Sequence, residues 1–327
     1  MRVSGFLTIL ALTSAACASA QQQNDGCNSG TDDIRIAALG GLAQAEPSQV
    51  LPIMRTILAR RDVCSVALRR QVVAMLARTR FGDQTEILQA SAQADPSVDV
   101  RRSALQALAQ TNSDQSLKAL DAFINGSGDM DLRDAALRAV GQSSSPVARA
   151  SLRRLIEQAS QPLELRTHAV GYLSWRRNPD DVPYLIDLYS RADSPDLRDA
   201  IFRSVANERT PDATKWLLSI TRDRGKDIEI RRQALSALGQ ALHGTDNSGG
   251  LDLAGLIGLY DEFKGQPEMQ DRTIEVISQR SEMAATDKLL AIARSEQNPE
   301  LRRKALVRVG QRRDPRVREL LLEVLSK

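Results

Sequence analysis

The residues in this sequence that could do acid–base chemistry recur at a fixed spacing. The stretch "DVRRSALQALAQ" at 99–110 has close copies at 131–142, 229–240 and 300–311, and each copy places an acidic residue two positions before an arginine. A carboxylate beside a guanidinium occurs in catalytic sites and also in structural ion pairs. Because one chain does not need the same catalytic group many times over, the repetition favours a structural role for these charges.

The arginine of this motif marks a repeat that covers most of the chain. Aligned positions recur at intervals of 32 to 34 residues, with a single interval of 39, and such a regular period indicates a repeat architecture. Apolar residues stand one position before, four after and seven after each anchor, which fits one face of an α-helix and no strand. The anchors are Arg35, Arg69, Arg101, Arg133, Arg166, Arg198, Arg231, Gln270 and Arg302.

A second apolar stretch with helical spacing lies between successive anchors. We therefore predict that each repeat forms two antiparallel helices. Neither helix can bury its apolar face alone, and the repeats must therefore stack. In "SPDLR" (194–198) and "NPELR" (298–302), Ser or Asn is expected as the N-cap, followed by Pro at the first helical position. We expect an all-α, right-handed solenoid of about nine two-helix repeats over 31–327, with the anchor helices lining its concave side.

The repeat resembles the HEAT family, and in particular the short HEAT-like repeats of the phycobilisome lyases. The resemblance is carried by the acid–apolar–Arg start and by the Ala-Leu-x-x-Leu/Val-Gly/Ala-Gln continuation, as in "DVRRSALQALAQ". It implies an α-solenoid and leaves the activity open, because such repeats serve many functions.

Two sets of side chains on the anchor helices follow from this arrangement. We expect each anchor arginine to bridge to the adjacent repeat, so that the bridges form a ladder that sets the stacking register. The ladder is Arg35, Arg69, Arg101, Arg133, Arg166, Arg198, Arg231 and Arg302. The candidate contacts for a protein partner point outward from the same helices and are Arg70, Arg102, Arg138, His168, Trp175, Arg203 and Arg232. Trp175 is included because Trp and Arg are enriched in binding hot spots, although packing on a neighbouring turn is the simpler interpretation.

The composition argues against several other classes of protein. The charges of the 44 basic and 41 acidic residues nearly cancel, which leaves a formal charge of +3. We therefore expect no broad positive electrostatic potential that would attract nucleic acid. The two histidines, His168 and His243, lie in different repeats, and no metal-binding or nucleotide-binding motif is present. We therefore expect no catalytic residues, no cofactor and no metal. The segment 243–250 lengthens one repeat and is expected to form a loop.

The N-terminus predicts export. Residues 1–20 have the pattern of a secretory signal peptide, and their apolar run is too short for a transmembrane span. An alternative makes Cys17 the lipid-attachment cysteine of a bacterial lipoprotein. A polar segment, 21–30, follows the signal peptide. Because exported proteins form disulfides, Cys27 and Cys64 are expected to pair, with two unpaired thiols as the alternative.

These features favour a periplasmic or extracellular scaffold that binds a protein partner through its concave face without catalysis. Two other functions stay open. The resemblance to the lyases implies a groove that holds a cofactor or chromophore, and the arginine-rich anchor helices would suit an anionic polymer. Export counts against both, and the nearly balanced charge counts against the polymer.

Overall fold

A computed structural model describes residues 29–42, 46–78, 84–126, 128–175, 178, 180–241 and 251–326. Within these ranges the chain folds into eighteen α-helices and a short 3₁₀ turn, with no strand. The fold is the all-α solenoid that the repeat predicts. The chain divides into two compact units, Met1–Ser145 and Pro146–Lys327, each with its own stack of helices.

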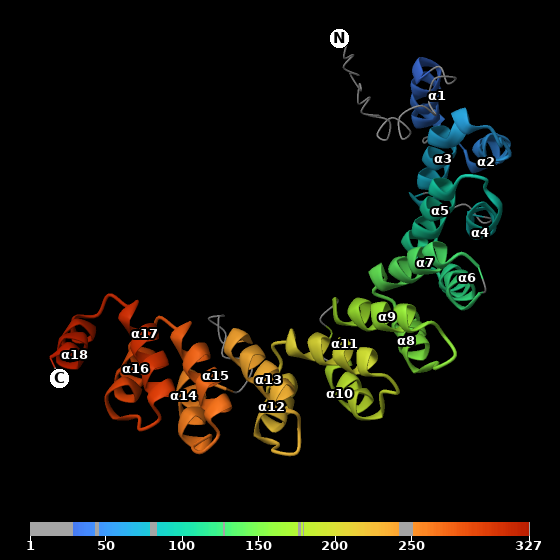
Figure 1. The fold of residues 1–327 in the computed structure, drawn as a ribbon. Helices are drawn as coiled ribbons and strands as arrows, with labels where there is room; N and C mark the ends of the chain where they lie inside the picture. Colours follow the sequence, from blue (N-terminus) through green and yellow to red (C-terminus); the bar gives the residue numbers. More distant parts are fainter. Residues whose placement is uncertain are drawn as a thin grey trace, which may run out of the picture. The chain divides into compact units, whose positions relative to one another are not determined.

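In unit 1 the helices form two layers, with the odd-numbered helices in one and the even-numbered helices in the other (Figure 1). The first described helix begins slightly before the start expected at residue 31. The helices are α1 (Ser29–Gly41), α2 (Pro47–Leu58), the 3₁₀ turn η2 (Val63–Ser65), α3 (Val66–Arg78), α4 (Gln84–Ala94), α5 (Val98–Thr111), α6 (Asp114–Asn125) and α7 (Met130–Gln142).

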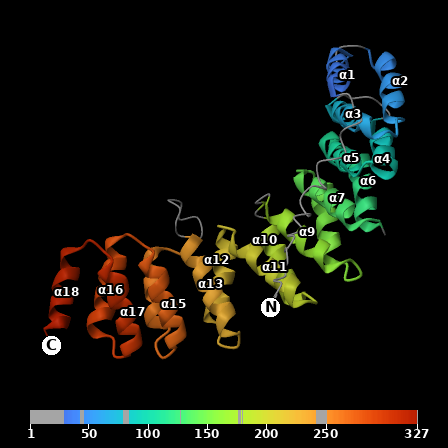
Figure 2. The ribbon, with the colours of Figure 1, turned by 45° about the horizontal axis from the view of Figure 1, so that its top comes forward.

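Unit 2 repeats the same alternation of helices (Figure 2). Its helices are α8 (Pro146–Glu157), α9 (Leu163–Trp175), α10 (Asp181–Arg191), α11 (Pro195–Ala206), α12 (Pro211–Arg222), α13 (Ile228–Ala241), α14 (Leu253–Glu262), α15 (Pro267–Ser278), α16 (Met283–Ser295), α17 (Pro299–Gly310) and α18 (Pro315–Leu325). In both units the anchor residues lie on the odd-numbered helices, and the apolar core lies between the two layers.

The helix starts confirm the predicted caps. At α11 the Ser194 hydroxyl accepts the backbone N–H of Leu197 at 3.1 Å, and Pro195 occupies the first helical position. At α17 the Asn298 side chain accepts the backbone N–H of Glu300 at 3.0 Å. Each cap satisfies amide donors that have no partner inside their own helix, which fixes where the odd-numbered helices begin.

The two-helix unit of the structure begins with an even-numbered helix. Each even helix packs against the odd helix that follows it, as α4 does on α5 and α16 on α17. Odd helices also stack on their odd neighbours in most places, whereas contacts between even helices are sparser. Among the described residues, α1 therefore has no even helix before it, and α18 has no odd helix after it.

Small residues allow the odd helices to stack closely. Gly239 of α13 faces Val276 of α15, and a Cβ atom at Gly239 would lie 2.1 Å from the Cγ1 atom of Val276. Any side chain at Gly239 would therefore force α13 and α15 apart. Ala104, Ala136 and Ala305, each three residues after an anchor, are completely buried for the same reason.

The anchor side chain ties the two helices of a hairpin together. It donates a hydrogen bond to a backbone carbonyl in the last turn of the preceding even helix, where carbonyls have no donor within the helix. The bonds are Arg133 Nε to Ile124 O at 2.8 Å, Arg166 Nε to Ile156 O at 2.8 Å, Arg231 Nε to Thr221 O at 3.0 Å, Arg302 Nε to Ala293 O at 3.0 Å and Gln270 Nε2 to Tyr260 O at 3.5 Å.

Three anchors also reach the next hairpin. The Arg69 guanidinium donates to both carboxylate oxygens of Asp95 at 2.9 and 3.1 Å. The Arg166 guanidinium grips Asp193 at 3.0 and 2.9 Å. Arg231 Nη2 donates to Gln266 Oε1 at 2.6 Å. These bonds join successive hairpins in the way expected of the ladder.

The bridges do not continue along the whole chain, which corrects the expectation of an unbroken ladder. Arg198 donates to the Ala192 carbonyl of its own hairpin at 3.0 Å, and Arg101 Nε has no hydrogen-bond partner. The acceptors of the three bridges share no aligned position either, since Asp95, Asp193 and Gln266 stand six, five and four residues before the next anchor.

Replacing Arg69 should destabilise unit 1 strongly. Its side chain is 1% exposed and Asp95 is 2% exposed, so Arg69→Ala leaves a buried carboxylate without its cation. We expect a loss of about 3–5 kcal/mol in the free energy of unfolding, measured by urea denaturation followed by circular dichroism. The neighbouring Arg70 is exposed and serves as the control, because Arg70→Ala should change the free energy by less than about 0.5 kcal/mol. Equal losses in both variants would contradict the assignment.

Candidate protein-binding surfaces

The predicted partner contacts all lie on odd-numbered helices. In unit 1, Arg70, Arg102 and Arg138 come from α3, α5 and α7; in unit 2, His168 and Trp175 come from α9, Arg203 from α11 and Arg232 from α13. Arg232 is half-buried and the others are exposed. We call the solvent side of the odd helices that carries these residues, taken within each unit by itself, the odd-helix face.

Four of the five predicted arginines of the odd-helix face are paired with carboxylates, and the fifth, Arg70, bonds to the Ser103 hydroxyl. The ion pairs are Arg102 with Asp131 at 3.3 Å, Arg138 with Asp134 at 3.0 Å, Arg203 with Asp199 at 2.8 Å and Arg232 with Glu229 at 3.4 Å. Each pair is solvent-exposed and contributes little to stability. Their main effect is on the electrostatic potential of this surface. Because neighbouring opposite charges largely cancel, no strong positive potential remains to attract a polyanion.

A shallow groove of about 340 Å³ lies between α3 and α5 on the odd-helix face. Arg70 lines it, together with the amide side chains of Gln71, Gln106 and Gln110. Arg70 Nε donates to Ser103 Oγ at 3.3 Å across the groove. Amides both donate and accept hydrogen bonds, so this lining matches the backbone of a bound peptide. Arg70 is one of the predicted partner contacts, and Gln106 and Gln110 stand four apart on one helix face, five and nine residues after the anchor Arg101.

Trp175 is the exposed tryptophan of unit 2. Its side chain is 66% exposed at the end of α9, so it is not a core residue. Trp216, by contrast, packs edge-on against Tyr189 with ring centroids 5.1 Å apart, and against Phe202 at 5.8 Å. A large exposed aromatic residue on the odd-helix face is a suitable anchor for a partner. Arg176 and Arg177, which follow it, lie outside the described residues.

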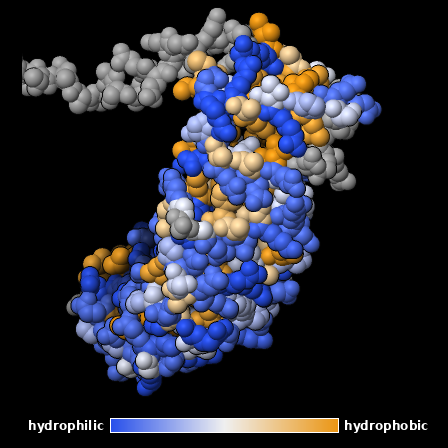
Figure 3. Space-filling model, turned by 90° about the vertical axis from the view of Figure 1, so that its right-hand side faces the viewer, coloured by the Kyte–Doolittle hydropathy of each residue, from blue (hydrophilic) through white to orange (hydrophobic). Residues whose placement is uncertain are grey.

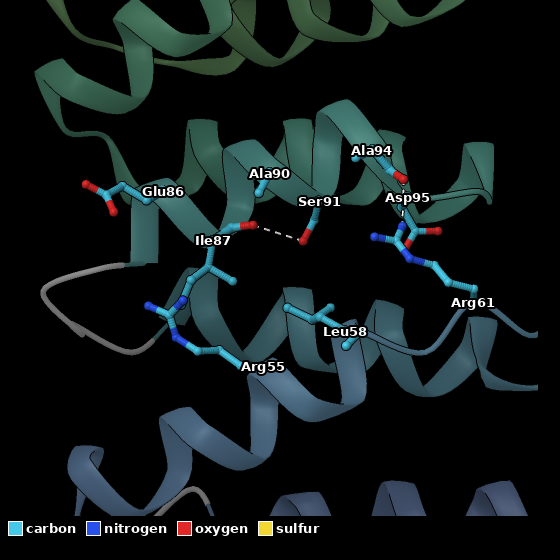
Figure 4. Close-up of a pocket in the computed structure, with 10 residues that line it drawn as sticks. Arg55, Leu58, Arg61, Glu86, Ile87, Ala90, Ser91, Ala94 and Asp95 are labelled. Carbon is cyan, nitrogen blue, oxygen red and sulfur yellow. Dashed lines mark hydrogen bonds between the residues drawn. The ribbon is translucent and has the colours of Figure 1, made fainter.

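A second cleft, of about 430 Å³, lies between the even helices α2 and α4 (Figure 4). Leu58, Ile87 and Ala90 give it an apolar lining. At one end Arg61 donates to the Ala94 carbonyl at 2.6 Å, and the carboxylate there, Asp95, is already held by the anchor Arg69. Arg55 and Glu86 also line the cleft, whose lining contains no histidine or cysteine. The cleft forms between two neighbouring even helices, so neither helix alone predicts it from its sequence.

Figure 3 shows polar side chains over much of the molecule in this view, with apolar side chains gathered toward its N-terminal end. Ile34 of α1 and Ile53 of α2 are among the exposed apolar residues of unit 1, at 72% and 41% exposure.

A polar pocket of about 720 Å³ lies between α14 and α16 in unit 2. The Tyr260 hydroxyl donates to Glu296 at 2.5 Å, and Lys288 Nζ contacts both carboxylate oxygens of Asp261 at 2.7 Å. Burial and the bond to Glu296 raise the pKa of Tyr260, and the same bond lowers the pKa of Glu296. Both pKa values move away from neutrality, the opposite of what a general acid or base requires.

The remaining predicted features lie partly outside the described residues. Cys27 lies outside the described residues, so the pairing of Cys27 with Cys64 stays a prediction. Cys17 and the insertion 243–250 are also outside the described residues. In the described part of the chain, no cluster of three or more His, Cys, Asp or Glu residues could hold a metal ion, and no helix is long and apolar enough to cross a membrane.

Comparison with known proteins finds a family that matches part of the chain. The model of the HEAT-repeat family matches residues 85–163 and 122–206, so this central part of the chain is similar to HEAT repeats. The match is to HEAT repeats in general and does not single out the phycobilisome-lyase type. The hairpins on either side continue the same helical alternation.

No curated protein matches the chain. Several solved structures do, and one of them is described as "Computational Design of Self-Assembling Cyclic Protein Homooligomers". It is 14% identical over 90% of this chain and 97% of that chain, with a TM-score of 0.13. At this TM-score the likeness carries no argument about the present protein.

The Tyr260–Glu296 bond should make stability depend on pH. Because the pKa of Glu296 is lowered in the folded state, its contribution is present above the ordinary glutamate pKa of about 4.3 and is lost as the pH falls through the folded value. We expect Tyr260→Phe to cost about 1 kcal/mol of unfolding free energy at neutral pH. The difference from the wild type should shrink below about pH 4.

The measurement is urea unfolding by circular dichroism at several pH values. Tyr189→Phe is the control, since among the described residues the Tyr189 hydroxyl bonds to no carboxylate, and its effect should not vary with pH in this way. A Tyr260→Phe difference that stays constant from pH 7 to strongly acidic pH would contradict the coupling.

Proposed function

We propose that the protein is an exported, non-catalytic HEAT-repeat scaffold that binds a protein partner through the odd-helix face. The observation that carries this proposal is the character of that face. It combines paired charges, a groove lined by amides between α3 and α5, and the exposed Trp175. Such a mixture suits a folded protein or a peptide, where hydrogen bonds, a few anchors and local charge matching give specificity.

The paired charges also favour a protein partner over an anionic polymer. Binding to a polyanion depends on unpaired cations that release counterions from it. Arg102, Arg138 and Arg203 each have a carboxylate within ion-pair distance, so a polyanion would have to displace that carboxylate first.

A lyase-like groove for a cofactor or chromophore is the other function that the resemblance suggests. The three pockets described above offer it little support. The cleft between α2 and α4 and the groove between α3 and α5 are lined by no histidine or cysteine, and the acid–base groups between α14 and α16 bond to each other. We therefore rank this function second.

Charge reversal on the odd-helix face should abolish partner binding. We expect crosslinking and pulldown of the tagged full chain from its native envelope, followed by mass spectrometry, to recover a partner. Arg102→Glu, Arg138→Glu and Arg203→Glu together should lose it, because each change sets a new negative charge beside an existing carboxylate.

The matched control is Arg191→Glu on the even helix α10. Arg191 forms the same kind of exposed pair, with Asp187 four residues away, so the variant changes charge without touching the odd-helix face. Loss of the partner in the control as well, or its retention in the triple variant, would move the binding site elsewhere. Recovery of a bound small molecule in place of a protein would favour the lyase-like groove.

Export makes a separate prediction about the chain that leaves the cytoplasm. Intact-mass analysis of protein from the envelope fraction should show that residues 1–20 have been removed, leaving Gln21 at the N-terminus. Peptide mapping without reduction should then join Cys27 to Cys64. A mass that begins at Cys17 with added lipid would support the lipoprotein alternative, and an uncut chain in the cytoplasm would contradict export.

A further inference from the structure

The anchor position of α15 carries a shorter side chain than the arginine anchors. Gln270 reaches the same kind of acceptor as they do, a carbonyl in the last turn of the preceding helix. Its amide nitrogen takes the place of an arginine Nε, but its bond to the Tyr260 carbonyl is 3.5 Å long, against 2.8 to 3.0 Å for the arginines. The Cζ atom and the two terminal nitrogens of an arginine are therefore missing from this hairpin.

In two other hairpins the guanidinium of the anchor holds a carboxylate of the next hairpin. Arg69 donates to both oxygens of Asp95 at 2.9 and 3.1 Å. The two terminal nitrogens of Arg166 donate to both oxygens of Asp193 at 3.0 and 2.9 Å. The part of the side chain that Gln270 lacks is thus the part that binds a carboxylate elsewhere in this chain.

The hairpin after Gln270 still offers the carboxylate. Glu296 stands six residues before the anchor Arg302, the same position that Asp95 holds before the anchor Arg101. Both carboxylates also accept the backbone N–H two residues further on, at 2.8 Å for Asp95 and 3.0 Å for Glu296. The position of Glu296 in its turn therefore matches that of Asp95, the acceptor that binds Arg69.

In the described part of unit 2, Glu296 forms no ion pair. Its two hydrogen bonds come from neutral donors, the Tyr260 hydroxyl at 2.5 Å and the Asn298 backbone N–H at 3.0 Å. The hydroxyl bonds to one oxygen and the N–H to the other. Because an ionised carboxylate has about four lone-pair sites, each oxygen of Glu296 can accept a further hydrogen bond.

The polar pocket of about 720 Å³ gives space for the missing group. Gln270 and Glu296 both line it. Two lysines line it as well, but neither takes the place of the anchor. Both carboxylate oxygens of Asp261 lie 2.7 Å from Lys288 Nζ, and the Lys264 side chain is exposed to solvent.

We propose that this pocket binds a guanidinium group that does not belong to the chain, as on an arginine, in place of the missing end of the anchor. The guanidinium donates two parallel hydrogen bonds to Glu296, as Arg166 does to Asp193. A planar guanidinium suits this contact better than an ammonium, which cannot donate in a rigid fork. The site lies between even helices, so it is independent of the partner proposed for the odd-helix face.

A blocked arginine tests the site directly. N-acetyl-arginine-N-methylamide, titrated into the purified full chain, should show saturable binding by isothermal titration calorimetry. Glu296→Gln should raise the dissociation constant at least ~10-fold, because a neutral amide cannot accept two charge-assisted bonds. The blocked lysine analogue should bind the wild type at least ~10-fold more weakly than the blocked arginine. The matched control is Glu268→Gln, which removes an exposed charge of α15 outside the pocket lining and should bind like the wild type.

Gln270→Arg supplies the missing group from the chain itself. This variant should raise the urea concentration at the midpoint of unfolding, and the gain should disappear when Glu296→Gln is added. It should also weaken the binding of blocked arginine at least ~10-fold, because its own guanidinium occupies the pocket. Circular dichroism shows whether each variant is folded, and the Glu296→Gln comparison decides the question even if Gln270→Arg does not fold.

The source of the guanidinium is assigned by comparing free arginine with the blocked form. Tighter binding of free arginine indicates a small-molecule ligand, and equal or weaker binding indicates an arginine within a polypeptide. The proposal is overturned if blocked arginine shows no saturable binding to the wild type. It is also overturned if the lysine analogue binds equally well, or if folded Glu296→Gln or Gln270→Arg binds blocked arginine like the wild type.

Discussion

The structure depends on one hydrogen bond that recurs in five hairpins, from an anchor side chain to a carbonyl in the last turn of the preceding helix. This bond satisfies a carbonyl that the helix itself leaves without a donor. It also fixes the first turn of one helix beside the last turn of another. Gln270, at the anchor position of α15, makes the same contact with an amide in place of the guanidinium. The geometry of the bond is therefore retained where the charge is not.

The sequence predicts the fold well because the relevant signals are local. Apolar positions at helical spacing, Ser or Asn caps and small residues at the stacking positions all lie within one repeat, and Ser194 and Asn298 act as expected. The grouping of helices into hairpins is less local. Pairing an even helix with the odd helix after it depends on packing between elements, which the period alone does not reveal.

The candidate surface was harder to predict for a similar reason. The outward positions of Arg102, Arg138 and Arg203 follow from the helix period, but their acidic partners become evident only with the helices in place. The reach of an anchor to the next hairpin depends on a loop residue outside the repeated motif. Arg166 bonds to Asp193 and Arg231 to Gln266, and these two acceptors stand at different distances from the next anchor. The amide groove needs two neighbouring helices and has no signature in either one alone.

The placement of the two tryptophans has a practical consequence for fluorescence measurements on this protein. Both Trp175 and Trp216 belong to unit 2, one largely in solvent and the other within an aromatic cluster. The intrinsic fluorescence of the chain is therefore a spectrum of unit 2, with a red-shifted and a blue-shifted component. Tryptophan emission will report on structural changes at α9 and around α12, while unit 1 can unfold without shifting the emission wavelength.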